Sequence, residues 1–497
     1  MRIQISIILF LLINLTIYGQ KAKEAKIQYK ANTVEVDRKI GKGAQRLLDD
    51  VMFVHGGATM YCDSAYFYSK KNSLDAFDNI YINQGDSVFI YGDFLHYDGN
   101  TKLATLTGEV KLIHDETTLT TTKLDYNLES SVAYYGAYAK TVNKENTLES
   151  IKGFYYSRKK TAIFHDSVIL TNPDYTMYSD TVEYETESGI ARFFGPTDLL
   201  GDSSHVYGEF GWYDTEKDLA EIKTNAWAQN KNQTIFGEYI FYNQNTGDGI
   251  AHDNVRILEE EQNILMLGNN AKYNDITEYA FLTDSAQFIQ FTSEGDSLYL
   301  NADTIKTFPD TLGYKLIFAY YDVRFYRSNV QGKCDSMVYS FADSTARLYV
   351  KPVLWTGKNQ ISASQIDIYT KNQKMEKMYL YNSSFITSQE ASTLFNQIKG
   401  KNMVCHFKDN QLHQIDVNGN GQTVYFPKDE GDIAGVNLSE CSNIKIYLVD
   451  NDIERINFYV QPKGGMYPLH MAPENKLKLK GFNWQSELRP KDRYDIF

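Results

Sequence analysis

The sequence predicts an all-β protein built from stacked two-strand repeats of about 29 residues. Three observations predict this class. Apolar and polar residues alternate through most of the chain, strand-favouring residue types are abundant, and a tyrosine recurs at a nearly constant interval. An alternation with a period of two indicates strands that bury one face, and self-similarity at this interval is typical of stacked repeat architectures.

The alternation is regular in segments such as 104–112 and 122–126. The chain contains 38 Tyr and 27 Phe, and Pro173 is its first proline. Aromatic residues favour sheets and proline interrupts them, so this composition agrees with long runs of strand.

The repeat becomes visible when the tyrosine near the end of every second strand is used as a marker. The markers are Tyr68, Tyr97, Tyr126, Tyr156, Tyr184, Tyr213, Tyr242 and Tyr273, at intervals of 28 to 31 residues. A polar turn follows most markers, and an alanine such as Ala104 or Ala133 opens the next strand. We therefore expect one strand of each repeat in each of two facing sheets, with the marked side chains in line on one face.

Such a row of apolar side chains would line an interior groove able to shelter a lipid acyl chain, whose exposure to water costs about 0.8 kcal/mol per methylene. A packed core is the alternative. The residues expected to line the groove are Leu95, Tyr97, Leu106, Val110, Leu124, Tyr126, Phe154, Tyr156, Phe164, Val168, Val182, Tyr184, Phe193, Tyr213, Ile222, Ile240, Tyr242, Tyr273 and Leu282.

The N-terminus has the pattern of a secretory signal peptide, because Arg2 precedes a mostly apolar stretch that ends near Gly19. An uncleaved anchor is the alternative. The C-terminal segment is rich in Pro and Lys and interrupts the alternation. We divide the chain into a signal peptide (1–19), regular β-repeats (20–300), less regular β-repeats (301–461) and an irregular C-terminal tail (462–497).

Two copies of the repeat show a family resemblance most directly. They are Leu124-Asp125-Tyr126-Asn127 followed by Ala133, and 93–98 followed by Ala104 and Gly108-Glu109-Val110. From about residue 31 to about residue 284 the chain resembles the OstA-like, or LptA-type, lipopolysaccharide transport proteins. The resemblance implies an elongated β-jellyroll, or β-taco, whose apolar inside holds the acyl chains of lipid A.

The resemblance further implies a periplasmic protein, associated in one alternative with the outer membrane, that aids lipopolysaccharide transport and outer-membrane assembly. Its partners would be lipopolysaccharide or a related glycolipid, other envelope transport proteins, a barrel formed by another chain, or a further copy. Terminal strands of an open stack can pair with such partners edge to edge. The positions expected to do so are Val34 and Val36 at one end and Ile444, Ile446 and Leu448 at the other.

Other classes of function find little support. The net charge of -13 argues against a nucleic-acid partner. The segment Asp416–Gly421 matches the opening of a calcium loop, but Pro427 stands where a bidentate Glu is required, so we expect an Asn/Gly hairpin turn. No motif predicts a metal, a cofactor or a catalytic site. A secreted β-helix enzyme acting on polysaccharide, and a structural or adhesive repeat protein with a filled core, remain as alternatives.

Overall fold

The computed structural model describes residues 26–36, 43–292, 295–372, 374–449 and 452–497. The predicted signal peptide lies outside the described residues. Most described residues are in antiparallel strands, and helix is confined to short 3-10 turns, which confirms the predicted all-β class. The chain divides into two compact units: the first holds residues 1–173 and 181–187, and the second holds residues 174–180 and 188–497.

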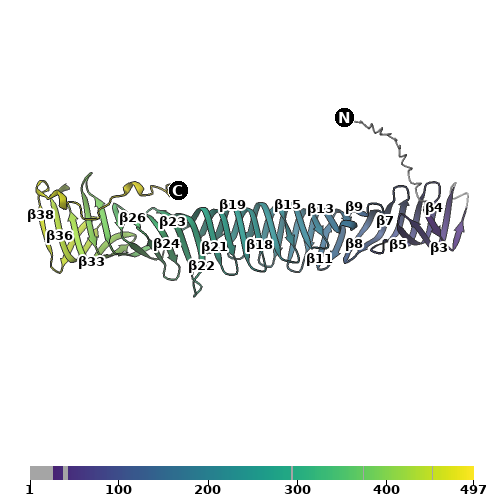
Figure 1. Cartoon of the computed structure of the whole chain (residues 1–497), viewed down its shortest axis with the longest axis horizontal. Helices are drawn as coiled ribbons and strands as arrows, with labels where there is room; N and C mark the ends of the chain where they lie inside the picture. Colours follow the sequence, from purple (N-terminus) through teal and green to yellow (C-terminus); the bar gives the residue numbers. More distant parts are fainter. Residues whose placement is uncertain (1–25, 37–42, 293–294, 373, 450–451) are drawn as a thin grey trace, which may run out of the picture. The chain divides into compact units, whose positions relative to one another are not determined.

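In the first unit the strands lie beside one another mostly in chain order and are joined by short turns (Figure 1). Strand β14 (Tyr175–Glu185) contributes residues to both units. The other strands of this unit are β1 (Gln28–Lys30), β2 (Thr33–Glu35), β3 (Ala44–His55), β4 (Ala58–Tyr68), β5 (Ser73–Gln84), β6 (Val88–Asp98), β7 (Leu103–His114), β8 (Thr117–Asn127), β9 (Val132–Tyr135), β10 (Ala139–Asn143), β11 (Asn146–Ser150), β12 (Lys152–Tyr156) and β13 (Thr161–Thr171).

A β-bulge bends the long strands of the first unit near their middle. In β5 it consists of Asp78 and Asn79, with φ of 61° and 49°, and the register with β4 and β6 shifts there. Asp49 and Asp50 do the same in β3. Asp and Asn adopt the left-handed region more easily than most residues, and a bulge both kinks and twists its strand.

The bulges fold the sheet over on itself. When the cross-strand pairs are followed from β6 through β5 and β4 to β3, Tyr97 lies opposite Gln45 of β3. His55 is ten residues further along β3. In a flat sheet Tyr97 and His55 would therefore lie roughly 30 Å apart or more. Instead the His55 Nδ1 and the Tyr97 hydroxyl are 2.7 Å apart. Each long strand thus contributes half of its length to each side of the fold, and the expectation of one strand per repeat in each sheet was wrong.

The second unit continues the same construction. Its bulges include Thr224 and Asn225 in β17 and Asp253 and Asn254 in β19. Its strands are β15 (Ile190–Gly201), β16 (His205–Asp214), β17 (Leu219–Gln229), β18 (Thr234–Asn243), β19 (Asp248–Glu259), β20 (Ile264–Asn274), β21 (Tyr279–Gln290), β22 (Leu298–Pro309), β23 (Lys315–Arg327), β24 (Val330–Ser340), β25 (Thr345–Tyr349), β26 (Val353–Thr356), β27 (Asn359–Ser362), β28 (Gln365–Lys371), β29 (Lys374–Tyr381), β30 (Ser384–Gln389), β31 (Phe395–Gly400), β32 (Asn402–Lys408), β33 (Gln411–Tyr425), β34 (Lys428–Asp429), β35 (Asp432–Ile433), β36 (Val436–Val449), β37 (Asp452–Tyr459) and β38 (Lys463–Tyr467).

After β24 the bent strands are replaced by pairs of short ones. Strand β24 pairs with both β25 and β26, after which β25, β28, β29 and β32 form one side and β26, β27, β30 and β31 the other. Both sides rejoin on β33. The segment Asp416–Gly421 lies inside β33, where Gly419 and Asn420 have φ of 85° and 52°, so the expected hairpin turn is instead a bulged corner.

Two predicted boundaries fall inside regular structure. Residues 300 and 301 lie within β22, because the alternation continues without a break. The predicted tail begins with β38, which pairs with β36, and continues with the short 3-10 helices η2 (Leu469–Met471), η3 (Glu474–Lys476) and η4 (Ser486–Leu488). A further 3-10 turn, η1 (Ser157–Lys159), follows β12. In the part of the chain that the structure describes, no helix has the length and apolarity to cross a membrane.

The rest of the tail is held by side chains of the second unit. Gln397 donates to the Leu477 carbonyl at 2.8 Å and accepts from the Leu479 N–H at 2.8 Å. The rings of Phe482 and Trp484 lie 5.1 and 5.3 Å from the ring of Phe395. The Gln397 side-chain amide thus makes the two hydrogen bonds that a neighbouring strand's backbone would make, and it holds this irregular segment against the second unit.

Candidate functional site

The inward-facing side chains of the first unit fill its interior. Leu106, Leu124 and Tyr126 are 0% exposed, so no water-sized space remains beside them. The other residues of the expected groove that are buried in this unit are Leu95, Tyr97, Val110, Phe164, Val168, Val182 and Tyr184. This interior is closed, and an acyl chain could enter it only if the two sides moved apart.

Two residues expected in this row lie elsewhere. Phe154 and Tyr156 are half-buried, and Phe154 contacts Tyr134 with ring centroids 5.0 Å apart. Tyr155 points inward instead and is 1% exposed. The predicted marker, Tyr156, was off by one position because three aromatic residues follow one another here. Tyr155, not Tyr156, keeps the 29-residue interval from Tyr126 and to Tyr184.

Most of the expected positions in the second unit are also buried. They are Phe193, Tyr213, Ile222, Ile240, Tyr273 and Leu282. Tyr242 is half-buried, stacks on Tyr273 with centroids 6.2 Å apart and donates to Asp275 at 2.7 Å. The sequence therefore placed most inward positions correctly, whether or not they meet a ligand.

A row of hydrogen bonds, which we call the seam, joins the two sides of the first unit. Each bond involves the hydroxyl of a tyrosine that is the second-last residue of its strand. Its partner is the polar side chain of the last residue of a strand that comes earlier in the chain. The pairs are His55 with Tyr97 at 2.7 Å, Gln84 with Tyr126 at 2.5 Å, His114 with Tyr155 at 2.7 Å, and Asn143 with Tyr184 at 3.0 Å. Because the pairs recur with the repeat, they close the fold at regular steps.

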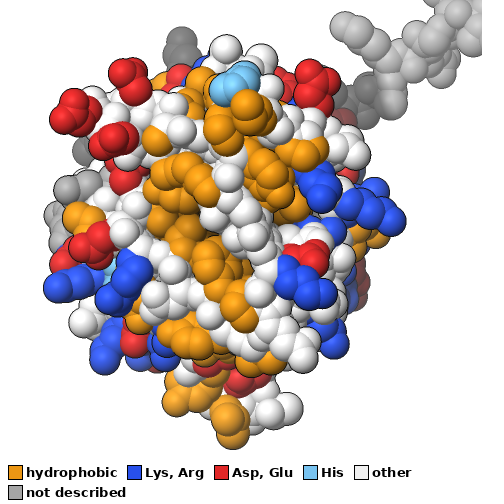
Figure 2. Space-filling model, turned by 90° about the vertical axis from the view of Figure 1, so that its left-hand side faces the viewer, with side chains coloured by type: hydrophobic (Ala, Val, Ile, Leu, Met, Phe, Trp, Pro, Cys, Tyr) orange, Lys and Arg blue, Asp and Glu red, His pale blue; other side chains and the backbone are white. Residues whose placement is uncertain are grey.

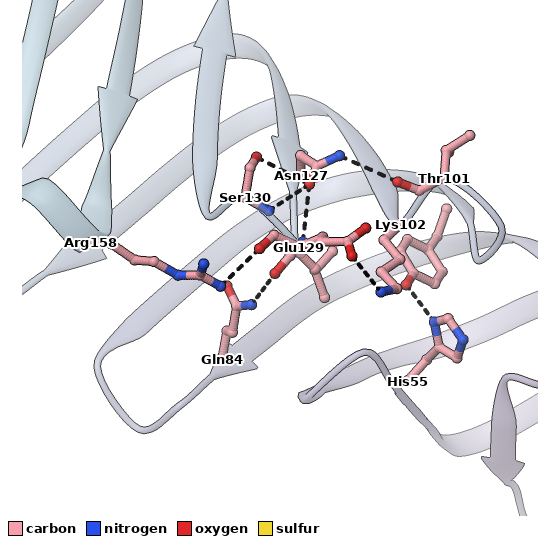
Figure 3. A network of polar contacts seen from close by, with 10 residues as sticks. His55, Gln84, Thr101, Lys102, Asn127, Glu129, Ser130 and Arg158 are labelled. Carbon is pink, nitrogen blue, oxygen red and sulfur yellow. Dashed lines mark hydrogen bonds and ion pairs between the residues drawn. The ribbon is translucent and has the colours of Figure 1, made fainter. Parts of the chain in front are cut away.

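Polar contacts between neighbouring turns surround the seam (Figure 3). The Gln84 amide, besides accepting from Tyr126, donates to the Leu128 carbonyl at 2.6 Å. Arg158 donates to the Glu129 carbonyl at 2.8 Å, and the Glu129 carboxylate lies 3.3 Å from Lys102. The Gln84–Tyr126 step of the seam is therefore linked to the neighbouring turns.

Burial sets the protonation of the seam. It raises the pKa of Tyr155 to about 12, so the phenol stays neutral and can donate. Burial also lowers the pKa of His114, an effect that Lys160 reinforces and Asp115 opposes. A neutral imidazole can accept from the Tyr155 hydroxyl, whereas an imidazolium cannot.

The second unit contains an ionic connection of the same kind. Lys315, at the start of β23, forms an ion pair with Glu259, at the end of β19. Both side chains are mostly buried. Here a charged pair joins strand ends that a flat sheet would keep apart.

Beyond this pair, the second unit encloses an apolar cavity of about 360 Å³. It lies where the bent strands give way to paired short ones, between β21 and β29. Arg327 is the charged residue of its lining, and it contacts Asp296 at 3.0 Å. The apolar residues that line the cavity are Phe288, Leu298, Leu300, Ile317, Phe325, Val330, Met337, Phe341, Ala346, Leu348, Ile368 and Met375.

None of the residues expected to line a groove lines this cavity, since the expected set ends at Leu282 and the cavity begins at Phe288. The cavity lies beside the point where β24 pairs with both β25 and β26, and its lining includes small residues such as Ala346. The only sequence signal was the loss of the regular interval after Tyr273. That signal indicates that the geometry changes after Tyr273, but it does not indicate whether the interior becomes wider or narrower.

Comparison with known proteins agrees with the predicted resemblance. Residues 23–180 match the model of the family described as OstA-like protein. This part of the chain is similar to OstA-like proteins, and we call it the OstA-like part. The chain is also similar to LptH from Pseudomonas aeruginosa, whose crystal structure is described as that of the LptA homologous periplasmic component of the conserved lipopolysaccharide transport device. That similarity has 19% identity and a TM-score of 0.20, and covers 22% of this chain and 81% of LptH. No curated protein matches the sequence.

The OstA-like part includes the seam up to Asn143, whereas the cavity lies beyond it. Near its N-terminal end are Val34, in β2, and Val36, and both are exposed. Among the described strands, β1 and β2 pair with β3 alone. The start of the OstA-like part therefore presents strands with one unpaired edge, as expected for this end.

The other predicted edge is displaced by one strand. Ile444, Ile446 and Leu448 are buried in β36, which lies between β33 on one side and β37 and β38 on the other. The sequence predicted a terminal strand here because the alternation of apolar and polar residues breaks off at Pro462. The terminal strands of the second unit are β37 and β38, and Tyr459, Val460 and Met466 are exposed there.

Figure 2 looks onto this end of the second unit and shows hydrophobic side chains gathered in the middle, with charged ones around them. An apolar centre with a charged rim is typical of a surface that contacts another molecule. This end therefore combines open strand edges with an apolar face.

Proposed function

We propose that the chain is a periplasmic lipopolysaccharide transport protein and that the second-unit cavity binds an acyl chain of the lipid. The observation that carries the proposal is the apolar cavity of about 360 Å³ inside a chain with an OstA-like part. Its volume equals the liquid share of roughly a dozen water molecules. Burying an acyl chain there would recover about 0.8 kcal/mol per methylene.

The lining supports a lipid over a purely structural role. A repeat protein that only spans a distance would fill its core, as the first unit does, and an empty apolar space of this size destabilises a fold unless a ligand fills it. Arg327 places a guanidinium beside the apolar lining, and a phosphate of lipid A would share this group with Asp296, its ion-pair partner.

We further propose that the inner rows of the first unit, including Tyr126, Tyr184 and Phe164, receive acyl chains when the seam opens. The support is that these rows are apolar and that hydrogen bonds at the ends of the strands join the two sides around them. In this view the seam is the site at which the first unit admits lipid.

A substitution that fills the cavity tests the main proposal. Ala346→Phe places a ring in the space, so the purified full chain should lose most of its binding to hexa-acylated lipid A, measured by displacement of a fluorescent fatty acid. Val338→Phe is the control, because Val338 neighbours the lining residue Met337 on β24 but does not line the cavity. Equal binding by the Ala346 variant, with an unchanged circular dichroism spectrum, would refute the cavity as the lipid site.

We also propose that the terminal strands pair with other envelope proteins or with a further copy. The support is the unpaired edge of β2 and the apolar end at β37 and β38. The Asn32 N–H donates to the Asp49 carbonyl of β3, so by alternation the Val34 N–H also faces β3 and the Thr33 N–H faces the open edge. Thr33→Pro removes this edge donor and should abolish assembly in analytical ultracentrifugation at an unchanged melting temperature, and assembly at the wild-type level would count against edge pairing.

A further inference from the structure

A groove on the outward face of the second unit, which we call the outer groove, is separate from the cavity and encloses about 690 Å³. Its floor follows one cross-strand row over β16 to β21. In order, the row consists of Tyr207, Trp227, Phe236, Arg256, Leu267 and Gln287. The volume lies within the range of about 300–1,000 Å³ that is usual for ligand sites.

Flat aromatic surfaces form one end of the outer groove. The rings of Tyr207 and Trp227 stack with centroids 6.0 Å apart and planes 19° from parallel. His205 meets the Trp227 ring edge-on at 4.6 Å and is itself held by Asp198 at 2.7 Å. Aromatic pairs of this kind also stabilise a bare sheet. The adjoining groove is what makes these rings available to a ligand.

The bulges supply the polar rim. The left-handed residues Asn225, Asn254, Asp284 and Ser285 lie along the groove in β17, β19 and β21, which alternate with β18 and β20. Asn225 already donates to Glu209 at 2.7 Å, which fixes its orientation. Amides, carboxylates and hydroxyls together offer both donors and acceptors at close intervals, a set that suits a ligand with many hydroxyl groups.

The charges of the groove narrow the class of ligand further. Arg256 lies over the Phe236 ring, with its guanidinium carbon 4.5 Å from the centroid, and Glu238 and Asp284 are the lining carboxylates. One cation against two anions gives no attraction for a polyanion such as a nucleic acid. A neutral ligand with apolar C–H faces and surrounding hydroxyls matches both the rings and the rim.

We propose that the outer groove binds a neutral oligosaccharide, with sugar rings stacked on Trp227 and Tyr207 and hydroxyls bonded to Asn225, Asn254 and Asp284. This goes beyond the acyl site, because the groove lies on the outward face and needs neither the cavity nor an opening of the seam. It assigns to the second unit a glycan site as well as a lipid site.

The test uses the full chain and an array of neutral oligosaccharides, followed by calorimetry with the best-bound glycan. Trp227→Ala and Tyr207→Ala should each weaken binding about tenfold or more, as is usual for central aromatic contacts. Trp212→Ala is the matched control, since Trp212 also lies on the outward face of the second unit but outside the groove. It should bind like wild type.

The outcomes separate this proposal from the lipid proposal. Lipid A binding should be unchanged in the Trp227 variant and lost in the Ala346→Phe variant, while glycan binding should show the reverse. The proposal is overturned if no neutral glycan on the array binds saturably. It is also overturned if Trp212→Ala weakens binding as much as Trp227→Ala, or if peptides from a casein digest occupy the groove while glycans do not.

Discussion

The two units have the same repeat but differ in their interiors. In the first unit the inward side chains fill the space and a seam of hydrogen bonds closes it. In the second unit the strands split after β24, an ion pair takes the place of a seam bond, and an apolar cavity remains. The first unit has a split of its own, with β9 and β12 on one side and β10 and β11 on the other, but it buries Tyr135 and Tyr155 there. The comparison teaches that the repeat sets the direction in which each side chain points, while the size of the inward side chains decides whether the interior is full.

The corner of the fold is built in two ways. A bulged strand holds its two halves at a fixed angle, because the backbone is continuous through Asp78 and Asn79. When a strand is replaced by two short ones, as at β25 and β26, a loop with Val350 and Lys351 at φ of 60° and 54° joins the halves. Strands β9 and β10 of the first unit form the same kind of corner beside a closed interior, so a divided strand does not by itself leave a cavity.

The largest expected effect comes from shortening a leucine in the closed interior. Leu124→Ala should lower the free energy of unfolding of the first unit by about 4 kcal/mol, because a full core leaves a new void. Leu300→Ala, beside the existing cavity, should cost about 2 kcal/mol, because its side chain loses fewer contacts. Denaturant unfolding of each variant measures both values, and equal costs would show that the two interiors are packed alike.

A smaller effect is expected at the seam. Tyr126→Phe removes the hydroxyl that donates to Gln84, which should cost about 1–2 kcal/mol and leave the inner ring in place. Amide hydrogen exchange should then quicken at the ends of β5 and β8. Tyr134→Phe is the control, because Tyr134 is exposed and should change stability by less than about 0.5 kcal/mol. Unchanged exchange in the Tyr126 variant would mean that the seam does not hold the sides together.

The sequence predicted the fold class, the interval and the direction of most side chains, because a period of two and a period of about 29 are both local patterns. It missed the seam, although His55, Gln84, His114 and Asn143 follow the same interval. Polar residues at a fixed place in each repeat would have indicated a recurring buried contact.

Other features could not be predicted from local pattern. Ile444 and Ile446 alternate in the same way whether β36 is terminal or has another strand beside it, since only tertiary pairing distinguishes the two cases. The cavity depends on the distance between two sides that are joined through distant strands. The outer groove combines residues from several strands, and none of them forms a motif alone.

The smallest expected effect is a pH dependence confined to the first unit. Burial lowers the pKa of His114 in the folded state, while the unfolded chain has the ordinary value of about 6.5. The unfolded state therefore binds more protons as the pH falls below that value, so the stability that neutral His114 contributes is present above pH ~6.5 and is lost on acidification. Protonation would also remove the acceptor for Tyr155. Melting temperatures of wild type and His114→Gln should converge near pH 5 and separate near pH 8, and a constant difference would show that His114 does not titrate within the seam.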